Sequence, residues 1–184
     1  MASAFSHALA AASIGSIVPH KGLGWRFWLI GILCAVLPDA DVISFSLGIP
    51  YDHLLGHRGL THSLLFAVVW SWLMVEIFCR FAERFSRSWW ILWGYFAICT
   101  ASHALLDAIT NGGLGVAFFA PFENSRYFMP WRPVQVAPIG AANFFSEWGI
   151  RVIKSELIFI GIPCLVISAG GWLWRRVVRL GSST

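Results

Sequence analysis

The chain alternates between long apolar stretches and short polar connections. Four apolar stretches stand out, over residues 25–37, 63–81, 89–109 and 157–178. The last three approach the roughly 20 residues that a helix needs to cross the hydrocarbon of a bilayer. The first is shorter, as is a further apolar stretch at residues 4–18. The pattern predicts an all-α integral membrane bundle of about four spans plus a short N-terminal apolar helix.

Composition agrees with a membrane protein of one domain, residues 1–184. Of the 184 residues, 58% are hydrophobic and 12% are charged, about half the charged share of a soluble domain. Eleven tryptophans suit a protein with two membrane interfaces. The net charge of +4 is spread over connections and helix ends, so we expect no nucleic-acid partner. The four cysteines lie in apolar stretches without a CxxC pair, which predicts buried thiols.

Positive charges distinguish the two ends of the predicted spans. One end collects eight: Lys21, Arg26, Arg80, Arg84, Arg87, Arg175, Arg176 and Arg179. The other collects five: Arg58, Arg126, Arg132, Arg151 and Lys154. The positive-inside rule places the first end in the cytoplasm of a multi-pass inner (plasma) membrane protein.

This topology brings histidines and aspartates from separate segments to one level, toward the outer face. They are His7, Asp39, Asp41, His57, His62, His103 and Asp107. His20, in the turn at residues 19–22, falls on the opposite side and is excluded. Ionisable groups at membrane depth are costly, and they are usually paired or functional. We therefore predict a site recessed below the outer surface.

His103 and Asp107 form the clearest pair. At a spacing of four residues they share one helical face, so imidazole and carboxylate can chelate one cation. The alternative is a hydrogen bond on a helix surface. His7 is the weakest of the predicted ligands, since an interfacial histidine explains it equally well.

The run HRGLTHS at residues 57–63 places His57 and His62 on either side of the start of a span. A turn at Gly59 can bring them together, and Thr61 or Ser63 can cap the helix. We predict that at least one of the two histidines binds metal. The alternative is a capped interfacial loop, and nearby His53 is a weaker candidate for an outer contact.

Arg58 lies between these ligands. A guanidinium beside a metal suits the binding of a phosphate or carboxylate. An arginine that reaches from the membrane to water explains it equally well. The aromatic segment around Arg126 is either an interfacial loop or one wall of a lipid-facing pocket.

Asp39 and Asp41, in the run LPDAD, are two residues apart and do not share a helical face. Both can converge on one site only if the chain is not helical after Pro38. The alternative is a solvated end of the span. Carboxylates combined with imidazoles suit Zn²⁺, Mn²⁺ or Fe²⁺, and Asp39 or Asp107 could bridge two cations.

Together these motifs resemble the YdjM-like family of inner-membrane, metal-dependent hydrolases. The pieces that carry the resemblance are Ser6 and His7, LPDAD at 37–41, HRGLTHS at 57–63, His103 with Asp107, Thr110, Gly113, and Pro121 with Arg126. The resemblance covers most of the chain to about Trp131.

That family is distantly similar to the zinc-dependent phospholipase C and single-strand nuclease group. The similarity implies ligands at His7, Asp39 or Asp41, His57 or His62, His103 and Asp107. The group's downstream histidines have no match here, because no histidine follows Asp107. The resemblance therefore implies one or two cations, with zinc favoured over manganese or iron.

The resulting expectation is a metal-dependent hydrolase that acts on a phosphoester in a lipid-linked or amphipathic substrate. Arg58 and Asp41 are the predicted catalytic residues, and Glu147 or Glu156 could serve as a general base. The first alternative is a non-enzymatic membrane protein with a structural or transport-related metal site. The second is a haem bundle with His62 and His103 as axial ligands.

Overall fold

The computed structural model describes residues 1–18, 24–138 and 146–181, with side chains as far as Val177. Throughout these ranges the regular structure is helical, and the only strand-like pairings described are two isolated bridges. The principal helices are α1 (Ala4–Ile17), α2 (Gly24–Val36), α4 (Leu64–Phe78), α5 (Arg87–Ala108), α7 (Glu147–Glu156) and α8 (Ile162–Gly181). The predicted all-α membrane bundle is confirmed. The predicted turn at residues 19–22, with His20, lies outside the described residues.

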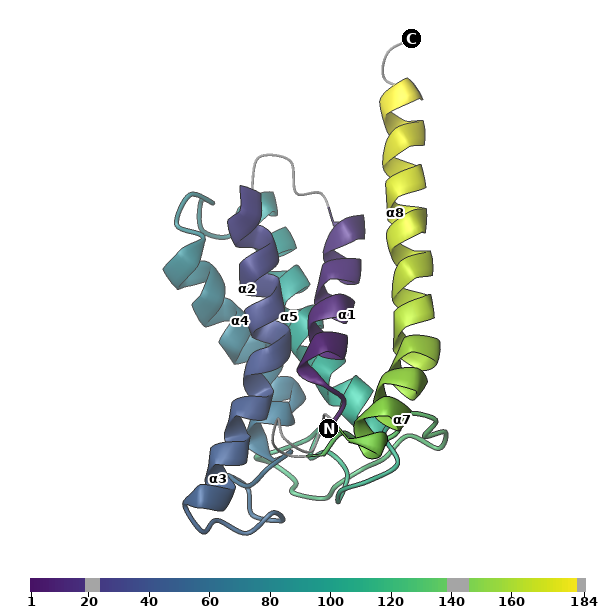
Figure 1. Ribbon diagram of the computed structural model, residues 1–184. Coiled ribbons are helices and arrows are strands. Elements are labelled where there is room, and N and C mark those ends of the chain that lie inside the picture. Colours follow the sequence, from purple (N-terminus) through teal and green to yellow (C-terminus); the bar gives the residue numbers. More distant parts are fainter. Residues whose placement is uncertain (19–23, 139–145, 182–184) are drawn as a thin grey trace.

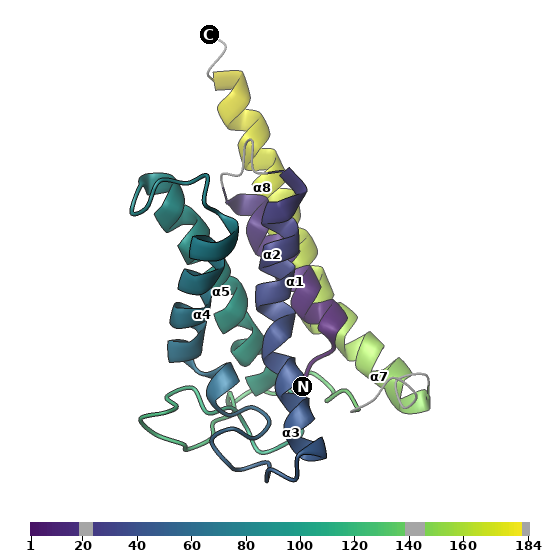
Figure 2. The same cartoon turned by 90° about the vertical axis from the view of Figure 1, so that its left-hand side faces the viewer.

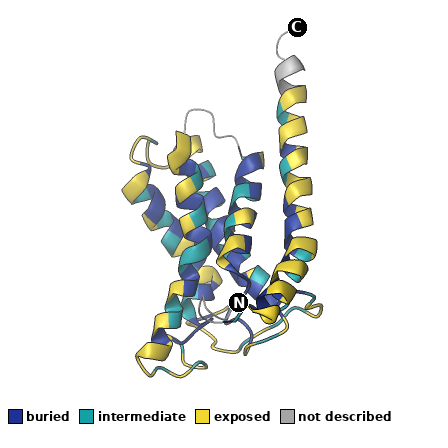
Figure 3. Ribbon diagram, in the orientation of Figure 1, coloured by how far each residue is buried: buried dark blue, intermediate teal, exposed yellow. Residues whose placement is uncertain are grey.

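Helices α1, α2, α4 and α5 pack side by side, and α8 stands at the edge of the bundle next to α1 (Figures 1 and 2). The N-terminus, the short helix α3 (Ile43–Ser46) and the long connections gather at one end, and the C-terminus lies at the other (Figure 1). Figure 3 shows that α8 leaves much of its surface exposed. Most of this exposed surface is apolar, as expected for contact with lipid.

The first span is longer than the sequence predicted. The helical segment does not stop at Pro38. After α2 the chain continues as a 3-10 helix, η1 (Leu37–Val42), and then as α3. Proline is tolerated in the first turn of a helix, where its missing N–H has no partner to lose. The whole element, Gly24–Ser46, has 23 residues.

Within the described residues, three helices are long and apolar enough to cross a membrane: Gly24–Ser46, Arg87–Ala108 and Glu147–Val177. Helices α1 and α4 are shorter. The last span begins ten residues before the predicted start, because its first part, α7, is amphipathic and carries exposed Arg151 and Lys154. A π-helical turn, η3 (Leu157–Gly161), joins α7 to α8.

Serine side chains cap the first turns of α4 and α5. Helix α4 starts at the end of the bundle where the N-terminus and the long connections gather, which we call the polar end, and α5 starts at the opposite end (Figure 1). The Ser63 hydroxyl accepts a hydrogen bond from the Phe66 N–H at 3.0 Å, which begins α4. The Ser86 hydroxyl does the same for Trp89 at the start of α5. Of the two predicted caps for α4, Ser63 is therefore the one used.

The core lies at the centre of α1, α2, α4 and α5. Buried Tyr95 of α5 stacks on Phe27 of α2, and its hydroxyl donates to the Ala11 carbonyl of α1 at 3.2 Å. Gly31 of α2 leaves room for that ring, since a Cβ there would lie 2.1 Å from the Tyr95 oxygen. The four cysteines are buried and free, as predicted. This core holds α1, α2 and α5 in fixed register up to the polar end.

Candidate metal centre

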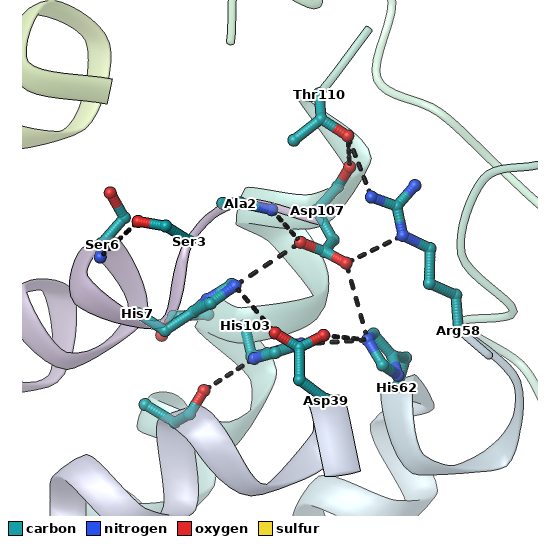
Figure 4. Close-up of polar contacts among 12 residues, drawn as sticks. Ala2, Ser3, Ser6, His7, Asp39, Arg58, His62, His103, Asp107 and Thr110 are labelled. Atoms are coloured by element: carbon teal, nitrogen blue, oxygen red, sulfur yellow. Dashed lines mark hydrogen bonds and ion pairs between the residues drawn. The ribbon is translucent and has the colours of Figure 1, made fainter. Parts of the chain in front are cut away.

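Four elements bring five ionisable side chains together at the end of the bundle (Figure 4). His7 comes from α1, Asp39 from η1, His62 from the 3-10 turn η2 (Leu60–His62), and His103 and Asp107 from α5. All five are buried, with at most 7% of any residue exposed. The structure thus places the predicted ligands from separate segments at one level.

The distances between their donor atoms suit a single cation. His103 Nε2 lies 2.9 Å from His62 Nε2 and 3.4 Å from Asp39 Oδ1. His62 Nε2 lies 3.7 Å from Asp39 Oδ1 and 3.6 Å from Asp107 Oδ2. A tetrahedral cation with bonds of 2.0–2.2 Å separates its ligand atoms by roughly 3.3 Å. Asp39, His62, His103 and Asp107 therefore match one coordination sphere.

His7 lies on the other side of the two carboxylates. Its Nε2 is 3.5 Å from Asp107 Oδ1 and 3.8 Å from Asp39 Oδ2, and its ring stacks on His103 with centroids 3.8 Å apart. Neither ring nitrogen of His7 and neither carboxylate oxygen of Asp39 has a hydrogen-bond partner among the described residues. Buried polar atoms are normally satisfied, so these orphaned donors fit a bound cation.

Second contacts fix the tautomers of the two facing histidines. His103 Nδ1 lies 2.6 Å from the Ala35 carbonyl, which can only accept, so this nitrogen carries the proton. His62 Nδ1 lies 3.2 Å from Asp41 Oδ2, which likewise favours a proton on that nitrogen. In neutral rings both Nε2 atoms then present lone pairs to each other. A cation between them, or an additional proton, relieves that repulsion.

The charge of the cluster also calls for a cation. Among its side chains, the carboxylates of Asp39, Asp41 and Asp107 face the single guanidinium of Arg58. With neutral histidines, the three carboxylates outnumber the Arg58 guanidinium and the Met1 amino group near Asp107, which leaves uncompensated negative charge in a buried setting, where isolated charges are strongly disfavoured. A divalent cation supplies the missing positive charge.

Arg58 is fully buried and supports Asp107 directly. Its Nε donates to Asp107 Oδ2 at 2.8 Å, while the two terminal nitrogens donate to the Gly112 carbonyl and the Thr110 hydroxyl. All three nitrogens are thus engaged within the protein. The predicted binding of a phosphate by Arg58 stays a prediction. In the structure the Arg58 guanidinium holds Asp107 and binds the segment that follows α5.

Asp41 and His57 form a second group that meets the first through His62. Asp41 Oδ1 lies 2.6 Å from His57 Nδ1, and Asp41 Oδ2 accepts from the Thr61 hydroxyl and the Arg58 N–H. Carboxylates that hold the far nitrogen of a metal-binding histidine are common around metal sites. The contacts of Asp41 therefore fit the orientation of His62, and its predicted catalytic role stays a prediction.

Asp39 and Asp41 do not converge on one point, because the chain stays helical after Pro38. The segment is a 3-10 helix, in which residues two apart point to different sides. Asp39 reaches the four-residue group and Asp41 reaches His57. His53, the weaker outer candidate, is exposed and contacts the Leu55 N–H instead.

The connection after α5 closes the end of the site. The Ala117 N–H donates to the Arg58 carbonyl, and the Leu64 N–H donates to the Phe118 carbonyl. Arg126 donates to the His57 and His53 carbonyls at 2.7 and 3.1 Å. This segment therefore braces the backbone of the HRGLTHS run.

Sequence reasoning missed several supporting contacts. The Ala2 N–H donates to Asp107 Oδ1 at 2.7 Å, and the Ala35 carbonyl holds His103. Both use backbone atoms, which leave no signature in residue type. The pairing of Arg58 with Asp107 joins residues 49 apart. The sequence offered one signal for this pair: Arg58 lies in the otherwise uncharged HRGLTHS run, and an arginine in such a place needs an acidic partner such as Asp107.

Opposing effects act on His62. Burial disfavours the charged ring, but the surrounding carboxylates of Asp107, Asp39 and Asp41 outweigh burial and raise the pKa of His62 to about 10. At neutral pH, without a cation, this ring is therefore protonated. A cation that binds at Nε2 has to displace that proton.

Comparison with known proteins identifies the family. The family model described as YdjM inner membrane protein matches residues 1–178. A protein of Escherichia coli K-12 described as inner membrane protein YbcI is 38% identical over 178 residues, which cover 96% of this chain and 99% of that protein. No solved structure matches the chain. The chain belongs to the YdjM family, as its motifs indicated.

Arg58 gives a first testable prediction. The substitution Arg58→Met should lower the free energy of unfolding of the metal-free protein by about 3–5 kcal/mol, because Asp107 is then buried without its partner. Unfolding in detergent micelles measures the change. Arg126→Met is the control, since Arg126 donates to backbone carbonyls, and its loss should cost about 1 kcal/mol. Equal losses in the two variants would contradict the proposed support of Asp107.

The proton on His62 gives a second prediction. Cobalt or zinc affinity should rise roughly tenfold per pH unit between about pH 6 and pH 8, because one proton leaves as the cation binds. Titration calorimetry in buffers of different ionisation enthalpy measures both the affinity and the proton release. Asp41→Asn should weaken this dependence, since it removes one of the carboxylates that favour the charged His62 ring. An affinity independent of pH, without proton release, would refute this assignment.

Proposed function

We propose that this protein is a membrane-bound, metal-dependent hydrolase of phosphoesters in lipid-linked or amphipathic substrates. The observation that carries the proposal is the pair of Nε2 atoms of His62 and His103, 2.9 Å apart and flanked by two buried carboxylates. Imidazole and carboxylate donors of this kind favour zinc, with manganese or iron as alternatives. Because His62 belongs to both groups of ligands, one cation is the simplest occupancy.

The chain's own residues divide the work. Asp39, His62, His103 and Asp107 would hold the cation, with His7 beside them. When bound, such a cation polarises a phosphoryl oxygen and lowers the pKa of water. Arg58 and Asp41 keep Asp107 and His62 in position. The buried setting strengthens each of these charge interactions.

The surroundings support a substrate that arrives from a membrane. At the same end of the bundle, a hollow of about 600 Å³ lies between the start of α4 and the connection after α5. Leu64, Leu65, Phe119 and Phe122 line it, and 84% of Phe122 is exposed. The adjacent backbone binds the HRGLTHS run. An apolar hollow next to a charged site suits an amphipathic molecule.

The proposed location is the inner membrane, with several passes and the metal centre toward the outer face. Three candidate spans, the family description and the description of the Escherichia coli relative support the membrane assignment. The orientation rests on the distribution of lysine and arginine between the two ends.

A structural metal site is the second candidate, and the burial of the ligands favours it. None of the four grouped residues is more than 7% exposed. Structural metal sites are closed by protein ligands, whereas catalytic sites keep one position open. The hydrolase and the structural site would both bind the cation, but only the hydrolase would turn over a substrate.

Metal analysis and an activity screen test the proposal together. Purified wild-type protein should hold about one zinc, manganese or iron per chain, and His103→Ala should lose it because a central ligand is gone. His53→Ala is the matched control, since His53 is exposed and outside the cluster. Phosphomonoester and phosphodiester lipids in micelles should then be hydrolysed by wild type and His53→Ala but not by His103→Ala.

The outcomes separate the candidates. Stoichiometric metal with no turnover on any phospholipid class favours the structural site. Metal that survives both His103→Ala and Asp107→Ala would refute the metal centre itself.

A further inference from the structure

We propose that Glu156 is a positioning residue that holds the N-terminal segment, and with it His7, against the metal centre. Glu156 is the last residue of α7, directly before the π-helical turn η3, and only 6% of it is exposed. It lies within the candidate span Glu147–Val177. An acidic side chain buried in a membrane span needs a specific partner. This inference deepens the proposed function and rests on its metal centre.

The partner of Glu156 is Ser3, with which it makes two contacts. One carboxyl oxygen accepts from the Ser3 N–H at 2.5 Å, and the other accepts from the Ser3 hydroxyl, also at 2.5 Å. Both carboxyl oxygens of Glu156 therefore accept hydrogen bonds from one residue, Ser3, at the start of α1. Hydrogen bonds to carboxylate oxygens are among the stronger ones in proteins.

Ser3 connects this clamp to the metal centre in two ways. The preceding residue, Ala2, donates its N–H to Asp107 Oδ1 at 2.7 Å. Ser3 is also the cap of α1, since its hydroxyl accepts from the Ser6 N–H and its carbonyl accepts from His7 N–H at 3.2 Å. A shift of Ser3 would therefore move both the support of Asp107 and the ring of His7. Figure 4 shows Ala2, Ser3 and His7 along one side of the cluster.

The rest of the last helix holds α1 along its length. The Ser13 hydroxyl donates to the Cys164 carbonyl at 3.0 Å, and Arg175 donates to the Ser16 carbonyl. Gly171 allows close approach, because a Cβ there would lie 2.9 Å from the Ser16 oxygen. Helix α1, with 14 residues, is too short to be fixed by spanning the bilayer alone. Of these contacts, the one made by Glu156 is with Ser3, which directly follows Ala2 and caps the helix that carries His7.

The test measures metal binding rather than turnover. Glu156→Ala should weaken cobalt affinity by about 10- to 100-fold, the usual effect of losing an outer contact of a metal site. Glu156→Gln should weaken it less, since the amide keeps one acceptor oxygen. The visible spectrum of bound cobalt should change in Glu156→Ala, because His7 and Asp107 move. Glu147→Ala is the matched control, an exposed glutamate at the start of the same helix.

A double-mutant cycle makes the test specific. Ser3→Ala combined with Glu156→Ala should cost less cobalt affinity than the sum of the two single losses, since both remove the same contact. A purely structural clamp would lower the melting temperature of the metal-free protein while leaving cobalt affinity and spectrum as in wild type, and that result would overturn the proposal. Additive losses would overturn it as well. Failure of wild type to bind metal would instead remove the proposed function on which it rests.

Discussion

Burial of three carboxylates and four histidines at the end of a membrane bundle is the constraint on which the rest of the structure depends. With neutral histidines, Arg58 and the Met1 amino group do not balance the three carboxylates, and the side chains of the cluster are buried. Ionised groups in such a place are tolerated when they are paired or bind metal. The facing nitrogens of His62 and His103 point to the same solution as the charge. A divalent cation satisfies both requirements with the residues already in place.

The scaffold follows from this requirement. Four elements carry the five side chains, and three of those side chains have a second contact that fixes their direction. The Ala35 carbonyl holds His103, Asp41 holds His62, and Arg58 with the Ala2 N–H holds Asp107. The core around Tyr95 keeps α1, α2 and α5 in register beneath them. The connection after α5 then covers the site and presents apolar side chains at the rim.

Much of this arrangement could be predicted from the sequence. The spacing of His103 and Asp107 on one helix placed two ligands, and apolar length together with charge asymmetry placed the remaining candidates at the same end. The direction of Asp39 and Asp41 could not be predicted, because it depends on the 3-10 geometry after Pro38. The role of Glu156 was equally hidden, since its partner Ser3 lies 153 residues away. Contacts through backbone atoms, such as those of Ala2 and Ala35, leave no mark on residue type.

X-ray absorption at the metal K-edge of the purified protein tests the central claim most directly. The cluster predicts a shell of nitrogen and oxygen atoms at about 2.0–2.2 Å, with the outer scattering of imidazole rings and no sulfur. The buried cysteines lie outside the ligand groups, so sulfur has no place in that shell. A sulfur shell at about 2.3 Å, or a spectrum without imidazole scattering, would contradict the account.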